Sequence, residues 1–273
     1  MRKRSEIDIR PLIEKLKRVP GALGKEMTTL INQEAKLFIS GGRGTPGVIE
    51  ITPPANAGNT GIKAKKQGES AVQRDIYRVY ATPRQAYDAL KEVDIDSAKI
   101  FWALFRGGDF TGAGEILRNV GGRTFIATRS FAKFDEGVMH KRFRNKQGRI
   151  TRQRVMMVVT DAAELKAYVK KMQGRVGLLS SGWVSAASKL GVRLPAWITR
   201  HGSGNGDIAI EMSGTEKMVI VMKNRVKYGA ANDLQRRVDY VIRYRKKALN
   251  RRLPYVLRAA LKKAGFSTSR AAA

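Results

Sequence analysis

The closing segment, residues 234–263, combines a helical apolar repeat with an almost unopposed positive charge. Apolar residues recur there at three- and four-residue spacing, which predicts one long helix from about Asn232 to Lys263, and Pro254 within it predicts a kink. The repeat consists of Leu234, Val238, Val241, Ile242, Leu249, Leu253, Leu257 and Leu261. A helix with this pattern must bury one side, and its basic side chains must then lie on the others.

The basic residues of this helix are opposed within it by Asp239 alone. Solvated helix faces usually alternate sign so that Glu and Lys pair four residues apart, and cations without such partners suit a phosphate backbone or an acidic protein surface. The predicted partner-facing residues are Arg236, Arg237, Arg243, Arg245, Lys246, Lys247, Arg251, Arg252 and Arg258. Tyr240, Tyr244 and Tyr255 are interleaved with them; base stacking is one role, and a core or interface role is favoured.

The whole chain of 273 residues has 53 Lys and Arg against 23 Asp and Glu, a net charge of +30. Such an excess destabilises a compact state by self-repulsion, so we expect compensating negative charge on nucleic acid or a partner; the alternative is a solvated basic surface. With no cysteine, disulfides, thiolate zinc sites and cysteine nucleophiles are excluded. No apolar run is long enough to span a bilayer, so no membrane partner is expected.

Elsewhere the patterns predict an α+β fold with long helices packed on an antiparallel β-sheet. Residues 9–39 predict a helix interrupted at Pro20, and the Gly- and Pro-rich residues 41–61 predict an extended arm with a glycine hinge and a short extended piece at 48–52. Residues 69–80 predict a helix. Two strands, 124–128 and 155–160, are predicted around a turn at 145–148, and a hairpin with a buried return strand is predicted at 208–222.

The expected division of the chain is an α+β core of 1–40 with 155–273, and an insertion of 41–154.

Basic residues also line the predicted middle hairpin. Arg142, Arg144 and Arg149 are predicted there as a second set facing DNA or an acidic partner.

A heptad-like apolar stripe follows Asp161, which is placed to cap a helix with Glu164 three residues on. The stripe contains Leu165, Val169, Met172, Val176, Leu179, Trp183, Ala186 and Leu190. It predicts one helix up to Gly191 that packs on the core of its own domain, with self-association as the alternative. Glycines at 174, 177 and 182 weaken the helix and leave room for another backbone.

Chemistry-bearing motifs are few, and the sequence predicts no catalytic residue, cofactor or metal site. His140 and His201 have no metal-ligand spacing around them and are interpreted as polar surface groups. Asp94 and Asp96 alternate as in some magnesium sites but have no third acidic partner. The glycines at 41–44 follow a helix and precede Thr45 and Pro46, which does not fit a phosphate loop.

Two groups of segments together resemble structural proteins of tailed bacteriophages encoded near the head–tail joining genes. One group is Gly174–Gly177, Ser181–Trp183, Ala186–Ala187, Leu190–Gly191 and Pro195–Gly202; the other is Ile51–Pro54, Lys66–Glu69 and Arg74–Ile76. The layout of an N-terminal helix, a hairpin and a long basic C-terminal helix is similar to neck and tail-completion proteins, including the minor tail protein Z-like group. The resemblance covers about half of the chain, and residues 41–160 depart from compact members.

The resemblance implies a non-enzymatic virion protein that is assembled in the host cytoplasm. It implies a ring, six- or twelve-fold, which contacts portal or adaptor and tail proteins around a DNA channel; rings need heterologous interfaces that close. The predicted subunit-interface residues are Pro53, Pro54, Leu179, Trp183 and Trp197. The alternative from another class is a free basic protein that condenses or packages DNA, and a nuclease using Asp94 or Asp96 is the weakest alternative.

Overall fold

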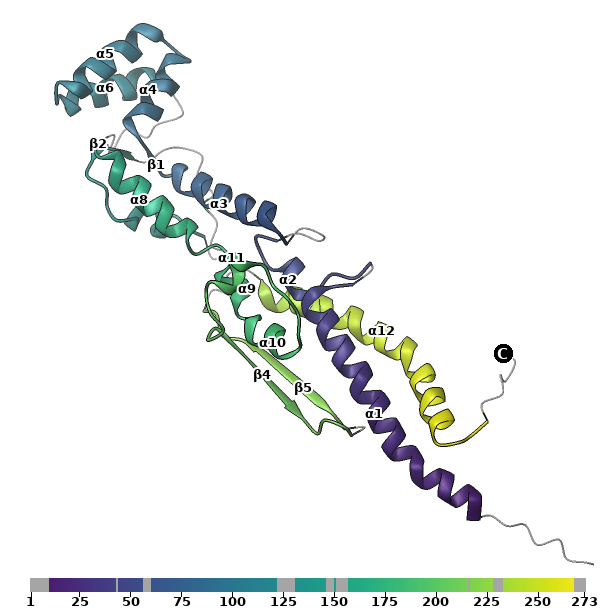
Figure 1. The fold of residues 1–273 in the computed structure, drawn as a ribbon. Coiled ribbons are helices and arrows are strands. Elements are labelled where there is room, and N and C mark those ends of the chain that lie inside the picture. Colours follow the sequence, from purple (N-terminus) through teal and green to yellow (C-terminus); the bar gives the residue numbers. More distant parts are fainter. Residues whose placement is uncertain are drawn as a thin grey trace, which may run out of the picture. The chain divides into compact units, whose positions relative to one another are not determined.

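The computed structural model has the predicted mixed α+β fold (Figure 1). It describes residues 10–42, 44–55, 60–121, 131–145, 150, 157–215, 217–227 and 233–267. The chain forms two compact units: unit 1 is Met1–Gly61 with Gly177–Ala273, and unit 2 is Ile62–Val176. The division expected from the sequence was a core of 1–40 with 155–273 and an insertion of 41–154. Its boundaries differ, because residues 41–61 belong to unit 1 and residues 155–176 to unit 2.

Unit 1 is built on two long helices, α1 (Arg10–Ser40) and α12 (Leu234–Lys263), which pack together and run in opposite directions (Figure 1). Both helices were predicted, and their apolar stripes bury Leu30 and Ile39 of α1 and Val241 and Ala260 of α12. The predicted interruption at Pro20 is wrong, because α1 continues through it. Pro20 is exposed, where water can bind the carbonyl that its missing N–H leaves unpaired.

The predicted extended arm folds back onto these helices, so the arm and hinge interpretations are wrong for the residues described. Residues 48–51 form a short helix, α2 (Val48–Ile51), in place of the predicted extended piece; it contacts α1 and α12, and it buries Val48 and Ile49 completely or nearly so. An isolated bridge joins Gly42 to Thr45. At Gly47 the backbone passes so close to α1 that an added Cβ would lie 2.4 Å from the Ile39 carbonyl oxygen. Apolar burial and close packing therefore hold this loop against its own unit.

The predicted hairpin is present as β4 (Gly206–Glu211) and β5 (Val219–Asn224), which pair antiparallel. Helix α10 (Val184–Lys189) packs on β4, so a short helix, rather than the long ones, covers this sheet. The return strand was predicted to be buried, but β5 alternates between half-buried and exposed residues, as expected for a sheet with one covered face. Two short helices, α9 (Leu178–Ser181) and α11 (Ala196–Thr199), complete unit 1 and contact each other.

The continuous helix predicted over residues 161–190 is wrong. Helix α8 (Ala162–Gln173) begins at the predicted Asp161 cap and ends before Gly174; α9 and α10 follow as separate short helices. Gly177 has a φ of +100°, and a Cβ there would lie 2.6 Å from the Trp197 carbonyl oxygen. The positive φ and the close carbonyl oxygen both require glycine at this position. The turn at Gly177 therefore interrupts the helix, and the predicted apolar stripe does not form one continuous surface.

Unit 2 contains the remaining helices and a small parallel sheet. In chain order its elements are α3 (Ile62–Tyr77), β1 (Tyr80–Ala81), α4 (Pro83–Lys91), α5 (Ile95–Arg106), α6 (Phe110–Val120), β2 (Phe131–Ala132), α7 (Val138–Arg142), β3 (Met157–Val159) and α8. The strand order is β1-β3-β2, with both pairs parallel.

The sheet of unit 2 separates two apolar clusters. One cluster centres on Ile76, Tyr80 and Leu165, and the other on Leu90, Phe101 and Leu117 of α4–α6. The strand predicted at 155–160 is confirmed at Met157–Val159. The strand predicted at 124–128 and most of the turn at 145–148 lie outside the described residues; Arg144 and Ile150, on either side of that turn, form an isolated antiparallel bridge.

Two glycines of α1 provide a matched test of how the hairpin is seated. A Cβ on Gly24 would lie 2.5 Å from the Gly214 carbonyl oxygen in the β4–β5 turn, whereas a Cβ on Gly21 meets no atom within 4 Å. We expect Gly24→Ala to lower the free energy of unfolding by about 1–3 kcal/mol through overpacking. Gly21→Ala should raise it by about 0.5–1 kcal/mol, since glycine is a poor helix former. Urea unfolding of both variants measures the difference, and equal effects would contradict this seating.

Candidate functional site

The basic residues of α12 divide into an inner set, which faces unit 1 itself, and an outer set. The inner set centres on Glu34 of α1. Arg245 lies 3.6 Å from its Oε2 (Nη1), with both side chains 9% exposed, and Arg252 lies 2.8 Å from its Oε1 (Nη1). Near the end of α12, Lys263 pairs with Glu26. Two acidic residues of α1 therefore pair with three cations on the side of α12 that packs against it.

Two inner residues also hold α2 and the loop before it. Arg245 donates from Nη2 to the Thr45 carbonyl oxygen at 3.2 Å, and Arg237 donates from Nη1 to the Ile51 carbonyl oxygen at 2.9 Å. The prediction that Arg245 faces a partner is wrong, because this side chain is buried. Arg237 and Arg252 are half-buried and bonded within the unit, so they are poorly placed to bind another molecule.

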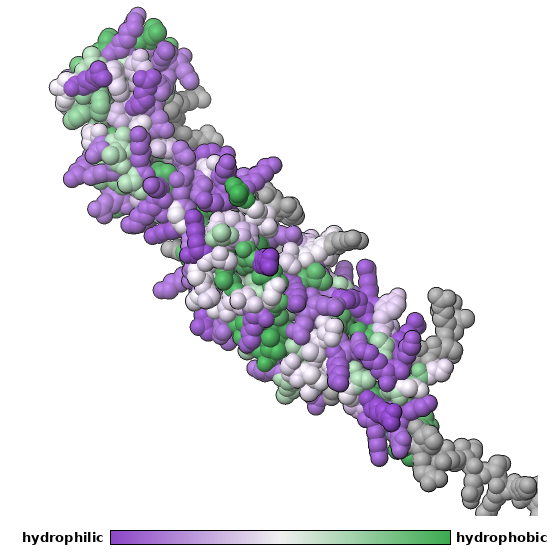
Figure 2. All heavy atoms as spheres, viewed as in Figure 1, coloured by the Kyte–Doolittle hydropathy of each residue, from purple (hydrophilic) through white to green (hydrophobic). Residues whose placement is uncertain are grey.

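The outer set consists of exposed cations with no acidic partner among the described residues. Its members are Arg243, Lys246, Lys247, Arg251, Arg258 and Lys262. Arg236 is exposed too, but lies 3.8 Å from the Asp233 carboxylate. Figure 2 shows hydrophilic residues along α1 and α12 on the face in view. The cations of the outer set are exposed to water, so their positive charge is available to bind a polyanion.

The outer surface of α12 is hollowed on both sides of Tyr240. One hollow, of about 520 Å³, is lined by Tyr240, Arg243, Tyr244, Lys246, Lys247 and Asn250. The other, of about 340 Å³, is lined by Ile51, Asp233, Arg236, Arg237 and Tyr240. Tyr240 and Tyr244 are each 41% exposed and Tyr255 is 69% exposed. Of the core or interface role favoured for these tyrosines, the core part is therefore wrong, and the interface part stays a prediction.

The second predicted basic set, in unit 2, is only partly described. Arg142, at the end of α7, is exposed, while Arg144 donates from Nη2 to the Asp75 carboxylate at 3.2 Å. Arg149 lies outside the described residues. Arg144 therefore has a structural partner within its own unit.

Most of the predicted interface residues are buried within unit 1. Leu179, Trp183 and Trp197 are 9%, 3% and 5% exposed. Trp183 packs edge-on against Phe38 of α1, and the Trp197 indole N–H donates to the Thr60 carbonyl oxygen at 3.0 Å. The prediction that these three contact a second subunit is wrong, because their side chains form the core of their own unit. Pro53 and Pro54 are half-buried.

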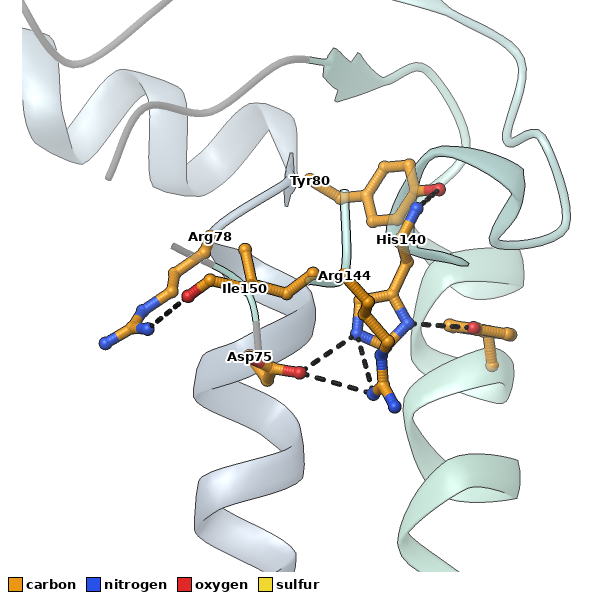
Figure 3. A network of polar contacts seen from close by, with 7 residues as sticks. Asp75, Arg78, Tyr80, His140, Arg144 and Ile150 are labelled. Atoms are coloured by element: carbon orange, nitrogen blue, oxygen red, sulfur yellow. Dashed lines mark hydrogen bonds and ion pairs between the residues drawn. The ribbon is translucent and has the colours of Figure 1, made fainter. Parts of the chain in front are cut away.

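A buried polar network joins α3, α7 and α8 in unit 2 (Figure 3). His140 is 1% exposed, which contradicts its interpretation as a surface group. Its Nε2 lies 3.3 Å from Oδ2 of Asp75, and its Nδ1 lies 3.0 Å from the Tyr168 hydroxyl. The Asp75 carboxylate can only accept a hydrogen bond, whereas the Arg144 guanidinium, whose Nη2 lies 3.3 Å from the same Nε2, can only donate one, so the roles of the ring nitrogens depend on the tautomer.

The backbone of His140 belongs to a second chain of bonds, through Tyr80 and Asp135. The His140 N–H donates to the Tyr80 hydroxyl at 3.1 Å, and that hydroxyl donates to the Asp135 carboxylate at 2.5 Å. Asp135 also accepts from the backbone N–H groups of Gly137 and Met139 at the start of α7. Burial and the Asp135 bond raise the pKa of Tyr80. These contacts fix the position of α7, and such satisfied buried networks stabilise a unique packing.

The pKa of Asp75 makes the stability of unit 2 depend on pH. Burial alone would raise this pKa, but the hydrogen bond from His140 and the charge of Arg144 outweigh it, so the pKa falls below its ordinary value of 3.8. The ionised carboxylate therefore stabilises the fold. Its contribution is complete above pH 3.8 and is lost as the pH falls through the lower pKa of the folded state.

We therefore expect Asp75→Asn to lower the free energy of unfolding by about 1.5–3 kcal/mol at neutral pH, where charged hydrogen bonds are lost. The difference from the unsubstituted protein should shrink toward zero in strong acid. Urea unfolding at neutral pH and at about pH 2 measures it. A difference that stays constant between the two would show that Asp75 does not act as an ion.

The other candidates for chemistry have structural roles. Asp94 caps α5 by accepting from the backbone N–H groups of Asp96 and Ser97, and the hydrogen bond from Ser97 lowers its pKa. Asp96 pairs with Lys99 at 3.0 Å. His201 lies beside Arg200, with Nε2 3.4 Å from its Nε. Within the described ranges no three His, Asp or Glu side chains are grouped to hold a metal ion.

Comparisons with protein-family models, curated proteins and solved structures returned no match. Of the helices that the structure describes, none combines the length and apolar character needed to cross a membrane. The function must therefore be argued from the residues and from the geometry of α12.

Proposed function

We propose that this protein is a non-enzymatic structural component of a tailed-bacteriophage virion. It acts at the head–tail junction and binds a polyanion through the outer face of α12. One observation carries the binding role: acidic residues of α1 pair with inner cations of this helix, while Arg243, Lys246, Lys247, Arg251 and Arg258 are exposed without acidic partners among the described residues. A face of one sign in water favours phosphates or clustered carboxylates.

The virion setting rests on the resemblance of residues 51–76 and 174–202 to neck and tail-completion proteins. In that setting the outer face lines a DNA channel or contacts acidic portal, adaptor or tail proteins, and copies of the chain form a closed six- or twelve-fold ring.

The subunit contacts of such a ring fall on exposed apolar residues. Leu12, Ile13 and Leu16 on α1 are 51%, 42% and 53% exposed, and Val219 and Val221 on β5 are 47% and 37% exposed. Burying such side chains favours association.

The second candidate is a free nucleic-acid-binding protein that condenses or packages DNA. The exposed tyrosines among the outer cations favour it, because bases can stack on such rings. One copy of the chain supplies both the tyrosines and the cations of this surface.

Mass determination by light scattering, together with a search for the chain in purified particles, separates the two candidates. A virion component should form a closed ring or be present in particles. A free DNA-binding protein should be a monomer or dimer that binds duplex with an affinity falling steeply as salt rises. A monomer that is absent from particles would refute the virion proposal, and failure to bind DNA or polyglutamate would refute the polyanion role of α12.

A further inference from the structure

Two tyrosines lie at the N-terminal end of the outer basic face of α12. The ring centroids of Tyr240 and Tyr244 lie 4.9 Å apart at an interplanar angle of 58°, one helical turn from each other. The neighbouring Tyr244 hydroxyl, through a side-chain hydrogen bond, raises the pKa of Tyr240. Both rings nevertheless remain 41% exposed, which leaves ring surface available for a ligand.

Cations and an amide surround these rings. The larger hollow, about 520 Å³, brings Arg243, Lys246, Lys247 and Asn250 to the same surface as both tyrosines. The smaller one, about 340 Å³, extends it past Tyr240 to the exposed Arg236. The surface therefore alternates aromatic and cationic groups along the helix, and a strand laid along α12 would meet both kinds.

An acidic protein surface would pair with the cations and pack against the rings, but it has no regular repeat of anionic and flat aromatic groups. A duplex would also use the cations, but its bases are paired and stacked inside, out of reach of a tyrosine on a helix surface. A strand with unpaired bases supplies both groups at every nucleotide, because its phosphates pair with the cations while its bases stack on the rings.

We propose that the outer face of α12 binds single-stranded nucleic acid. Bases stack on Tyr240 and Tyr244, and phosphates pair with Arg243, Lys246 and Lys247. The proposal rests on the polyanion role of α12 and names its ligand. Stacking on a ring accepts every base, so this binding is tolerant of sequence.

Fluorescence anisotropy with the full chain tests this proposal, using a labelled single strand of about 12 nucleotides and its duplex at matched salt. The single strand should bind more tightly. The double variant Tyr240→Leu, Tyr244→Leu keeps every cation and should weaken single-strand binding about 5- to 150-fold for each base that stacks. Duplex binding should change less than about twofold, because it depends on the phosphates.

Two control variants separate stacking from folding. Tyr255→Leu removes an exposed tyrosine of the same helix that lines neither hollow, and it should leave both affinities unchanged. Tyr240→Phe with Tyr244→Phe keeps both rings and should retain most single-strand binding, whereas a role for the hydroxyls alone would abolish it.

Three other outcomes of the binding experiment would contradict the single-strand proposal or the polyanion role on which it rests. Equal affinity for strand and duplex, with no effect of the double leucine variant, overturns the single-strand inference and leaves the polyanion role standing. Binding of polyglutamate but of neither nucleic acid assigns the face to an acidic protein and also overturns the inference. Binding of none of the three refutes the proposed role of α12 itself.

Discussion

Replacing Glu34 with leucine should lower the free energy of unfolding by about 3–5 kcal/mol, the cost of leaving a buried charge without its partner. Glu34 is the acidic residue that pairs with Arg245, whose side chain is 9% exposed, and it also pairs with Arg252. Without it, the Arg245 guanidinium keeps only its bonds to Thr45. Chemical denaturation followed by circular dichroism measures the loss.

Two further variants show whether the charge is the cause. Glu26→Leu removes the partner of Lys263, whose side chain is 64% exposed, and should cost only about 0–1 kcal/mol, as for other surface pairs. In the double variant Glu34→Leu, Arg245→Leu both charges are gone, and much of the lost stability should return. If the double variant is less stable than Glu34→Leu alone, the buried-charge explanation is wrong.

The second large effect concerns binding. Replacing Arg243, Lys246, Lys247 and Arg251 together with glutamine should make the affinity for duplex DNA both lower and less dependent on salt. Each phosphate contact contributes roughly 0.9 to the slope of log affinity against log salt, so the slope should become shallower by up to about 3.6. These residues are exposed and hold no acidic partner in the described chain, so stability should change little. Anisotropy titrations at several salt concentrations measure the slope.

The matched control removes the same charge elsewhere. Lys91, Arg118, Lys170 and Lys171 are exposed residues of unit 2, and their replacement with glutamine lowers the net charge by the same amount. If this variant weakens binding as much as the α12 variant, total charge rather than the α12 face determines affinity.

The long helices and the hairpin could be predicted because their signals are local. The apolar spacing of α12, the Asp161 cap and the alternation at Ile208 and Ile210 all act within a few residues. The unbroken helix over 161–190 failed although its spacing was helical. Gly177 needs a positive φ and lies against Trp197, a partner twenty residues further along the chain that spacing does not indicate.

The charged site was predictable in kind but not in detail. The sequence identifies α12 as basic, yet only the packing of α1 shows that Arg245 is buried beside Glu34 while Lys246 and Lys247 are exposed. The network around His140 was missed for the same reason, since Asp75 is 65 residues away and Tyr168 is 28 residues away. Partners so distant in sequence leave no periodic signal.

The division of the chain also sets an order for its synthesis. Unit 2 is continuous, whereas unit 1 needs both Met1–Gly61 and Gly177–Ala273. At roughly 5–20 residues per second, the ribosome needs about 10–40 s between completing α1 and reaching α12. We expect unit 2 to become protease-resistant in chains stalled before Leu234, and α1 to stay sensitive; early protection of α1 would disprove this. For that interval the apolar side of α1 has no α12 to cover it, so the nascent chain is a natural client for a chaperone.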